Sequence, residues 1–112
     1  AGAAPAAARE VKRYRVRVTR TARDDLLRLV RFLAANGPQT ARKAGRVLAA
    51  AFRSLALLPF ASRVAPGARP DPTLRELVVP FGSAGYVVLF RVTDARTVSV
   101  LAARHQREQD YH

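Results

Sequence analysis

A strict alternation of apolar and polar residues marks the segment KRYRVRVTR, residues 12–20. The apolar positions are Tyr14, Val16 and Val18. The positions between them are held by Arg13, Arg15 and Arg17. Successive side chains of a β-strand point to opposite faces, so this pattern predicts a half-buried strand with a row of guanidinium groups on its outer face. A charged outer strand also resists aggregation, which is a purely structural reason for the same arginines.

A segment with helical periodicity follows at residues 21–38. Its apolar stripe recurs at the three- and four-residue spacing of a helix face and comprises Ala22, Leu26, Leu29, Val30 and Leu33. Thr21 followed by Asp24 approximates a capping box at the start of this helix. The acidic pair Asp24 and Asp25 suits the positive end of the helix dipole, which is a simpler explanation for it than catalysis.

The tripeptide NGP at 36–38 ends the first helix, and its proline can open a second helix that extends to about residue 58. The apolar face of the second helix comprises Ala41, Ala44, Leu48, Ala51, Phe52 and Leu55. The other side carries Arg42, Lys43, Arg46 and Arg53. Because the connection is short, the two helices are predicted to form an antiparallel hairpin.

The second half of the chain has the pattern of a β-meander. Residues 59–72 hold four prolines and one glycine and are predicted to form a loop. Strands are predicted at 74–80, 86–92 and 97–103, with a glycine-containing turn at 81–85. The middle strand, YVVLFRV, is almost continuously apolar, as expected for a central strand covered on both faces. The order predicts an α+β fold, β-α-α-β-β-β, in which a helical hairpin packs on one face of a small twisted four-stranded sheet.

The chain has 112 residues, and residues 13–112 are expected to form one domain after a flexible, alanine-rich extension at 1–12. It contains no cysteine and two histidines, so disulfides and thiolate metal sites are excluded, and no metal or other cofactor is expected. No apolar run reaches the ~18–20 residues of a membrane span, and the first residues lack the apolar stretch of a secretory signal. A cytoplasmic location is therefore expected.

The charge balance changes the picture most. Twenty basic against eight acidic residues give a formal net charge of +12, and eighteen of the basic residues are arginines. Such a surface attracts partners that carry phosphates or carboxylates, and arginine binds both bidentately. A GC-rich genome would account for arginine in place of lysine, but much less well for the net excess. An acidic polypeptide or a nucleic acid is the expected partner.

Candidate chemistry is confined to the last three predicted strands and the tail, because no Gly-rich phosphate loop, HExxH, GxSxG or CxxC motif occurs. The candidate residues are Arg75, Arg91, His105 and Tyr111. If the strands pair in order, these side chains could converge near one end of the sheet. Guanidiniums would then stabilise negative charge at a phosphate while His105 or Tyr111 moves protons, as an RNA-cleaving site without metal requires. The structural alternative is that the arginines form strand-end ion pairs and His105 is an exposed terminal residue.

These segments together resemble the RelE/ParE toxin superfamily. The likeness spans about residues 13–111 and is most specific in LALLPFASR, in RELVVPF with GYVVLFRV, and in the terminal ARHQREQDY. The resemblance implies the growth-inhibiting toxin of a type II toxin–antitoxin system, often described as a plasmid stabilisation protein. It also implies a cognate acidic antitoxin that wraps the toxin in a hetero-oligomer, with operator DNA contacted only through the antitoxin. The charge of +12 suits such a partner.

The superfamily has two branches with different targets. RelE-like members are metal-independent endoribonucleases (mRNA interferases) that act on the ribosome, and the resemblance assigns their catalytic roles here to Arg75, Arg91, His105 and Tyr111. ParE-like members lack such a set and inhibit DNA gyrase. The helical hairpin and the passage from LALLPFASR to RELVVP favour the ParE branch, as does the absence of lysine near the candidate site in sequence. The long ending ARHQREQDYH departs from the plainest ParE pattern.

Antitoxin or target binding is assigned to a larger set of arginines, namely Arg13, Arg15, Arg17, Arg42, Arg46, Arg53, Arg104 and Arg107. A third interpretation, a basic RNA-binding domain without toxic activity, requires an aromatic stacking surface. No such surface is evident, because Phe81, Tyr86 and Phe90 are expected in the core or a turn.

Overall fold

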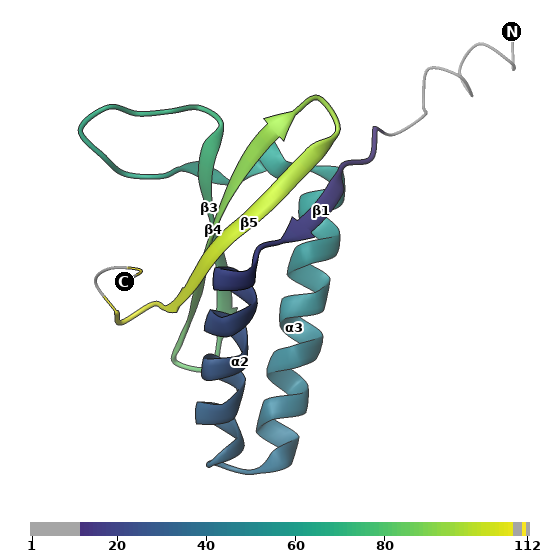
Figure 1. The fold of residues 1–112 in the computed structure, drawn as a ribbon. Helices are drawn as coiled ribbons and strands as arrows, with labels where there is room; N and C mark the ends of the chain where they lie inside the picture. Colours follow the sequence, from purple (N-terminus) through teal and green to yellow (C-terminus); the bar gives the residue numbers. More distant parts are fainter. Residues whose placement is uncertain (1–11, 109–110, 112) are drawn as a thin grey trace, which may run out of the picture.

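The computed structural model describes residues 12–108 and residue 111, and places two helices against a twisted sheet (Figure 1). The predicted extension lies, apart from its last residue, outside the described residues. The elements in chain order are β1 (Arg15–Val18), α2 (Arg20–Ala34), α3 (Pro38–Leu57), the 3₁₀ turn η1 (Pro59–Ala61), β2 (Arg63–Val64), β3 (Leu74–Phe81), β4 (Ala84–Asp94) and β5 (Thr97–His105). The predicted order is confirmed, with η1 and β2 as additions.

The sheet has five strands in the order β1-β5-β4-β3-β2. β1 pairs with β5 in parallel, and the other neighbours are antiparallel. The prediction of four strands was wrong, because the sheet has the short strand β2 as a fifth. In β2, Arg63 pairs with Glu76 and Val64 pairs with Arg75. The prolines around β2 do predict a loop, but the Arg75 guanidinium bonds to the carbonyl oxygens of Phe60 and Ser62 and holds this loop alongside β3.

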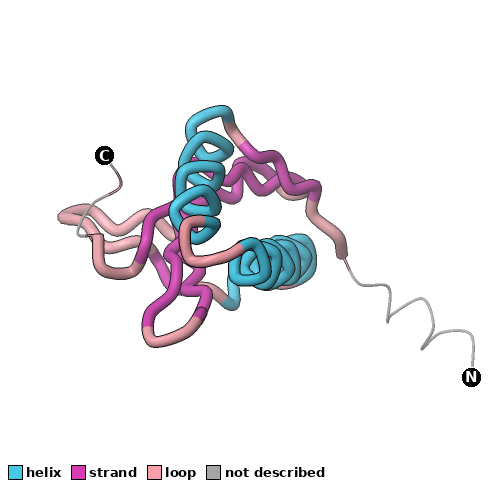
Figure 2. Tube along the Cα trace, turned by 90° about the horizontal axis from the view of Figure 1, so that it is seen from below, coloured by secondary structure: helices cyan, strands magenta, loops and turns pink. Residues whose placement is uncertain are grey.

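Both helices cover the same face of the sheet, and the core lies between the two layers. The buried cluster draws on α2, α3 and the three long strands, and comprises Ala22, Leu29, Leu48, Leu55, Val79, Tyr86, Val88, Phe90, Val92, Val98, Val100 and Ala103. The short loop between the helices makes them neighbours, as Figure 2 shows from the end that carries this loop. Pro38 is the first residue of α3, so the predicted break at 36–38 is confirmed.

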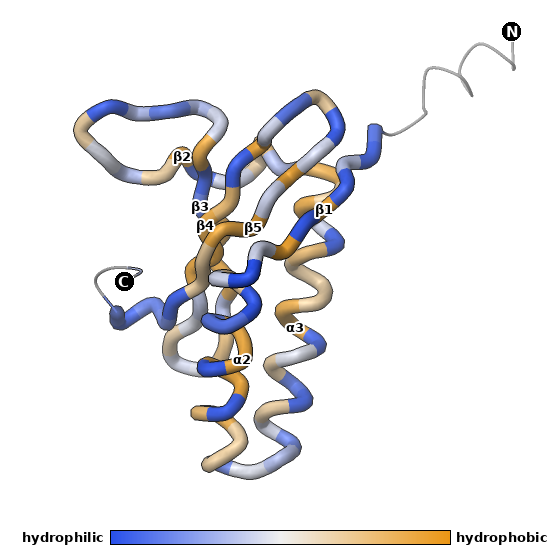
Figure 3. The backbone as a smooth tube through the Cα atoms, viewed as in Figure 1, coloured by the Kyte–Doolittle hydropathy of each residue, from blue (hydrophilic) through white to orange (hydrophobic). Residues whose placement is uncertain are grey.

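The central strand β4 is covered on both faces over its first half, as predicted. Tyr86 and Val88 face the helices, while Val87 faces away from them, and all three are buried. β5 extends two residues beyond the predicted end, so His105 belongs to the strand and pairs with Tyr86. In Figure 3 the hydrophobic colours concentrate where the strands meet the helices, whereas hydrophilic and hydrophobic segments alternate along α3.

The start of α2 differs from the predicted capping box. The N-cap is Thr19, whose Oγ1 accepts from the backbone N–H of Ala22 and donates to the carbonyl oxygen of Val100. Asp25 is 3 % exposed, and its Oδ2 accepts from the backbone N–H of Ala103 at 2.9 Å. β1 pairs with β5 only as far as Val100. The side chains at the start of α2 therefore complete the hydrogen bonding of β5 beyond that point.

Two glycines illustrate opposite requirements. Gly85, predicted in a turn, lies within β4, and a Cβ there would overlap the carbonyl oxygen of Val79. Gly45 is exposed on α3, and a Cβ there would meet nothing within 4 Å.

The Gly85→Ala variant is expected to lose about 1–3 kcal/mol of unfolding free energy, because β3 must shift to make room. The same change at Gly45 should be neutral or stabilise by up to about 1 kcal/mol, because alanine is the better helix former. Urea denaturation of both variants and the wild type measures the difference. Equal stability of the two variants would contradict the close approach at Gly85.

Candidate functional site

Side-chain alternation assigns the candidate residues to two faces of the sheet. Arg75 shares its face with Leu77 and Val79, which pack against the helices. Arg75 pairs with Phe90 and Leu74 pairs with Arg91, so Arg91 projects from the opposite, outer face. The two arginines are adjacent in the sheet but cannot contact one phosphate from the same side.

The guanidinium of Arg75 forms hydrogen bonds with backbone carbonyl groups of the protein itself. Its Nε donates to the carbonyl oxygen of Pro72 at 2.8 Å. Its Nη1 donates to the carbonyl oxygens of Ser62 at 2.6 Å and Phe60 at 3.3 Å. The group also lies 4.8 Å from the centre of the Phe60 ring. Arg75 therefore fastens the loop between η1 and β3.

Arg91 forms an ion pair with Asp71 at 3.2 Å on the outer face. Asp71 also accepts from the hydroxyl and the backbone N–H of Thr73, at 2.7 and 2.9 Å. The Thr73 hydroxyl, then the Thr73 N–H and to a smaller extent Arg91 hold the pKa of Asp71 below its usual value. This pair is the strand-end ion pair that the structural alternative predicted for Arg91.

A buried carboxylate, that of Glu76, binds several side chains on the outer face of the sheet. Glu76 is 2 % exposed and accepts from Arg63, whose Nη2 lies 2.8 Å from Oε1. Arg104 approaches the second carboxylate oxygen to 4.0 Å, and the hydroxyl of Tyr111 donates a short hydrogen bond to it. Burial, the hydrogen bond to Glu76 and the negative charge of Glu76 raise the pKa of Tyr111 above its usual value.

Arg104 holds the tail against this cluster. Its Nη1 donates to the carbonyl oxygen of Glu108 at 2.6 Å and, more weakly, to those of His105 and Gln106. Its guanidinium lies 5.1 Å from the centre of the Tyr111 ring. The side chain is only 13 % exposed, so Arg104 is a structural residue more than a surface for a partner.

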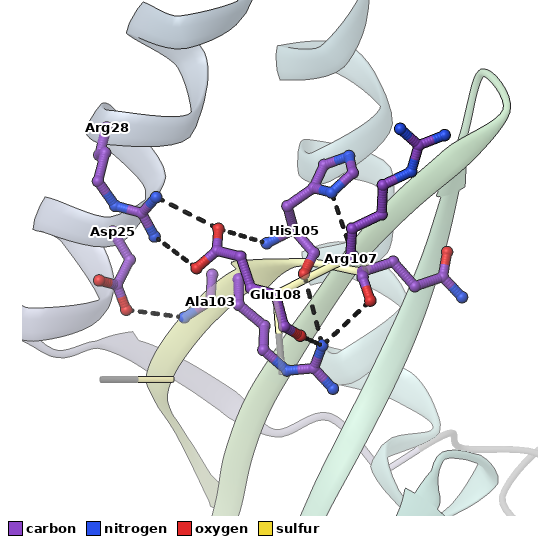
Figure 4. A network of polar contacts seen from close by, with 8 residues as sticks. Asp25, Arg28, Ala103, His105, Arg107 and Glu108 are labelled. Atoms are coloured by element: carbon purple, nitrogen blue, oxygen red, sulfur yellow. Dashed lines mark hydrogen bonds and ion pairs between the residues drawn. The ribbon is translucent and has the colours of Figure 1, made fainter. Parts of the chain in front are cut away.

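On the helix side, the tail is fastened to α2 (Figure 4). Glu108 bonds to both terminal nitrogens of Arg28, at 3.3 and 3.5 Å, and accepts from the backbone N–H of His105 at 3.1 Å. Burial alone would raise the pKa of Glu108, but the His105 N–H and Arg28 outweigh it and hold this pKa below its usual value. The tail thus contacts both layers of the fold.

His105 lies on the helix face, and its ring is nearly perpendicular to that of Tyr86, with 5.9 Å between the ring centres. Its Nδ1 accepts from the backbone N–H of Arg107 at 3.2 Å, so the neutral ring carries its proton on Nε2. This ring borders the α2 groove, a cleft of about 590 Å³ lined by Arg28, Leu29, Phe32, Leu33, Tyr86, His105, Arg107 and Glu108. Phe32 is 73 % exposed at its rim.

The four candidate catalytic residues are therefore not brought together. His105 on β5 pairs with Tyr86, and Arg75 on β3 pairs with Phe90, so the two lie on opposite sides of β4 and are offset by roughly 13 Å along it. Arg91 and the Tyr111 hydroxyl lie on the outer face, each bonded to its own carboxylate. Within residues 12–108 and 111, no three His, Cys, Asp or Glu side chains group closely enough to hold a metal ion.

Most of the arginines assigned to binding are on the surface. Arg13, Arg15 and Arg17 are exposed along β1 and the residues before it. Arg42, Arg46 and Arg53 are exposed on α3, and Arg107 is exposed beside the α2 groove. The exception is Arg104, as described above.

Sequence reasoning missed the α2 groove and the position of Asp25. Phe32 stands outside the apolar stripe of its helix, and an aromatic residue on a polar helix face is a signal that could have indicated the groove. The carboxylate of Asp25 gave no such signal, because the strand edge that it serves is distant in sequence.

The described part of the chain contains no helix long and apolar enough to cross a membrane.

A family model of the ParE toxin of type II toxin–antitoxin systems (parDE) matches residues 16–110. The chain belongs to this ParE toxin family. It is 33 % identical over 96 residues to Toxin RelE1 of Caulobacter vibrioides, covering 86 % of this chain and 97 % of that protein. The solved structure of a chromosomal ParDE toxin–antitoxin system from P. aeruginosa has the same fold, with a TM-score of 0.64, 22 % identity, and coverage of 86 % of this chain and 97 % of that one.

The resemblance to the RelE/ParE superfamily is thus confirmed, and the protein is the toxin of a type II toxin–antitoxin pair. Membership of the ParE family also implies an antitoxin partner.

The Tyr111→Phe variant of this ParE-family toxin should lose about 1–3 kcal/mol of unfolding free energy, because a buried carboxylate loses one of its donors. Tyr14→Phe is the matched control, since the Tyr14 ring contacts Lys12 while its hydroxyl makes no hydrogen bond within the described residues. The control should stay within about 0.5 kcal/mol of the wild type. Chemical denaturation measures both, and an unchanged Tyr111→Phe variant would contradict the role given to the tail.

Proposed function

We propose that this ParE-family toxin inhibits growth by binding DNA gyrase, without catalysing a reaction itself, and that an acidic antitoxin neutralises it in the cytoplasm. One observation carries the proposal: the residues that a metal-independent ribonuclease would need lie on two faces of the sheet, in separate internal bonds.

The chemistry of RNA cleavage makes this dispersal significant. General acid–base catalysis requires the proton donor and acceptor within hydrogen-bond reach of the same reacting group. Stabilisation of the extra charge at phosphorus requires donors aimed at the same point. Arg75 is bound to three carbonyl oxygens, and the hydroxyl of Tyr111 donates to Glu76. These contacts favour a toxin that acts by binding.

The α2 groove supports an antitoxin of particular chemistry. It combines the apolar side chains of Leu29, Phe32 and Leu33 with the cation Arg107 and the Arg28–Glu108 ion pair. A segment that alternates apolar anchors with acidic residues would fill it, and the net charge of +12 would draw such a segment in. We infer a hetero-oligomer in which the antitoxin, and not the toxin, recognises operator DNA.

A second candidate function is a RelE-like mRNA endoribonuclease that acts on the ribosome. One observation favours it: the His105 ring borders an open groove that also holds Arg28 and Arg107. A substrate in this groove would meet an imidazole, the guanidinium of Arg107 and the Arg28–Glu108 ion pair.

Assays with purified components separate the two candidates. The toxin is expected to inhibit supercoiling by gyrase and to increase cleaved DNA at least several-fold, while ribosome-bound transcripts remain intact. Addition of the antitoxin should reverse both effects. Transcript cleavage with normal supercoiling would show instead that the endoribonuclease assignment is right.

The His105→Ala variant tests the same question in cells. Under the proposed function, induced toxicity should change less than about twofold, because the imidazole makes no proton transfer. A general acid or base contributes typically 10²–10⁴-fold, so the ribonuclease would lose most of its toxicity. Gln106→Ala, at the exposed neighbouring position, is the control for nonspecific effects on the tail. Growth after induction, normalised to protein level, is the measurement.

A further inference from the structure

The exposed side of α3 carries a row of cations that have no partner among residues 12–108 and 111. The row consists of Arg42, Lys43, Arg46 and Arg53, and α3 contains no acidic residue over its 20 positions. None of the four forms a hydrogen bond or an ion pair within the described part of the chain. Arg28, Arg63 and Arg91, by contrast, each bind a carboxylate of the protein.

Helix geometry places the three arginines in line. With 100° of rotation per residue, positions 42, 46 and 53 fall within a sector of about 40°, and the rise of 1.5 Å per residue spreads them over about 16 Å. Lys43 flanks the row. Ala49 and Ala50 are exposed between the arginines, so no bulky side chain separates a partner from the helix.

A concavity of about 460 Å³ lies at one end of the row, lined by Gln39, Thr40, Arg42, Lys43 and Arg46. Hydroxyl, amide, ammonium and guanidinium donors are the groups that contact phosphate oxygens in protein–DNA interfaces. We propose that this α3 surface, defined by Gln39, Thr40, Arg42, Lys43, Arg46 and Arg53, binds the phosphate backbone of duplex DNA.

The same surface fits other polyanions less well. A protein partner needs apolar anchors at the centre of its interface, and the α3 surface offers only alanines there. Single-stranded nucleic acid needs aromatic stacking platforms, and Phe52, the aromatic side chain of α3, is packed against the core. A straight row of cations suits a rigid duplex with evenly spaced charges. The choice of DNA over double-stranded RNA rests on the proposed function, since gyrase acts on duplex DNA.

A second basic surface provides a matched comparison. Arg13 and Arg15 line a concavity of about 620 Å³ together with Asp94 and Arg96. The Arg96 N–H and Thr97, with a smaller contribution from Arg15, hold the pKa of Asp94 below its usual value. This surface already contains a counter-charge, whereas the described residues supply none to the α3 surface.

The experiment measures binding of the purified full-length toxin to a labelled 20-base-pair duplex by fluorescence anisotropy, without gyrase, across a salt series. The test variant carries Arg42→Gln, Arg46→Gln and Arg53→Gln. The control carries Arg13→Gln, Arg15→Gln and Arg17→Gln, which removes the same charge from the β1 surface. Thermal unfolding confirms that both variants fold.

We expect the α3 variant to bind roughly tenfold or more weakly at low salt, and its slope of log affinity against log salt to shallow by about three. The β1 variant should lose much less. Equal losses of DNA affinity in the two variants would show that only the total charge matters, and would overturn the proposal. Tighter α3-dependent binding to double-stranded RNA, or α3 losses confined to an acidic antitoxin peptide, would also overturn it.

Gyrase inhibition is measured separately with the same variants. DNA binding through α3 together with unaffected gyrase would contradict the proposed function while leaving the DNA-binding surface intact. Inhibition of gyrase without any α3-dependent DNA binding would overturn the DNA-binding surface while leaving the proposed function intact.

Discussion

The edge of β5 hydrogen-bonds first to β1 and, beyond the end of β1, to side chains at the start of α2. The rest of the fold depends on these hydrogen bonds between β5 and α2. Thr19 accepts from Ala22 and donates to the carbonyl oxygen of Val100. Asp25 accepts from the N–H of Ala103. A buried N–H without a partner, or a buried carboxylate without a donor, would cost free energy, so this hydrogen bond stabilises both groups. This contact fixes α2 on the sheet, which in turn places Arg28 where Glu108 can bind it and Phe32 at the rim of the α2 groove.

Periodicity predicted the elements well, because each depends on its own residues: the alternation in β1, the apolar stripes of the two helices, and the glycine–proline break between them. It failed where a distant group decides the outcome. The sequence predicted Thr21 as the helix cap, but the cap is Thr19, because the edge of β5 binds Thr19. The short strand β2 forms because Arg75, twelve residues along the chain from Arg63, binds the carbonyl oxygens of Phe60 and Ser62, which lie just before β2. Neither contact leaves a local pattern.

The candidate catalytic set shows why residue types in neighbouring strands do not define a site. Strand order was predicted well enough to place Arg75 and Arg91 near each other, but the register was not. Leu74 pairs with Arg91, and Arg75 pairs with Phe90, so the two arginines point to opposite faces. The turn at Gly82 sets this register, and a turn one residue longer would pair the arginines on a single face. Glu76, in contrast, gathers Arg63, Arg104 and Tyr111 because it is buried, and a buried carboxylate must be bonded.

The carboxylates of the protein also determine which of its positive charges remain unpaired. Asp71, Glu76 and Glu108 bind arginines of the protein, and Asp94 binds the N–H of Arg96. With these carboxylates engaged, much of the net charge lies on particular surfaces, and one of them is α3, whose row of cations has no counter-charge among the described residues. Under the proposed assignments, the apolar anchors lie in the α2 groove and a row of free cations lies on α3. An antitoxin that fills the groove with apolar side chains and extends acidic residues over α3 would then neutralise the toxin by occupying the surface needed for DNA, without any change in fold.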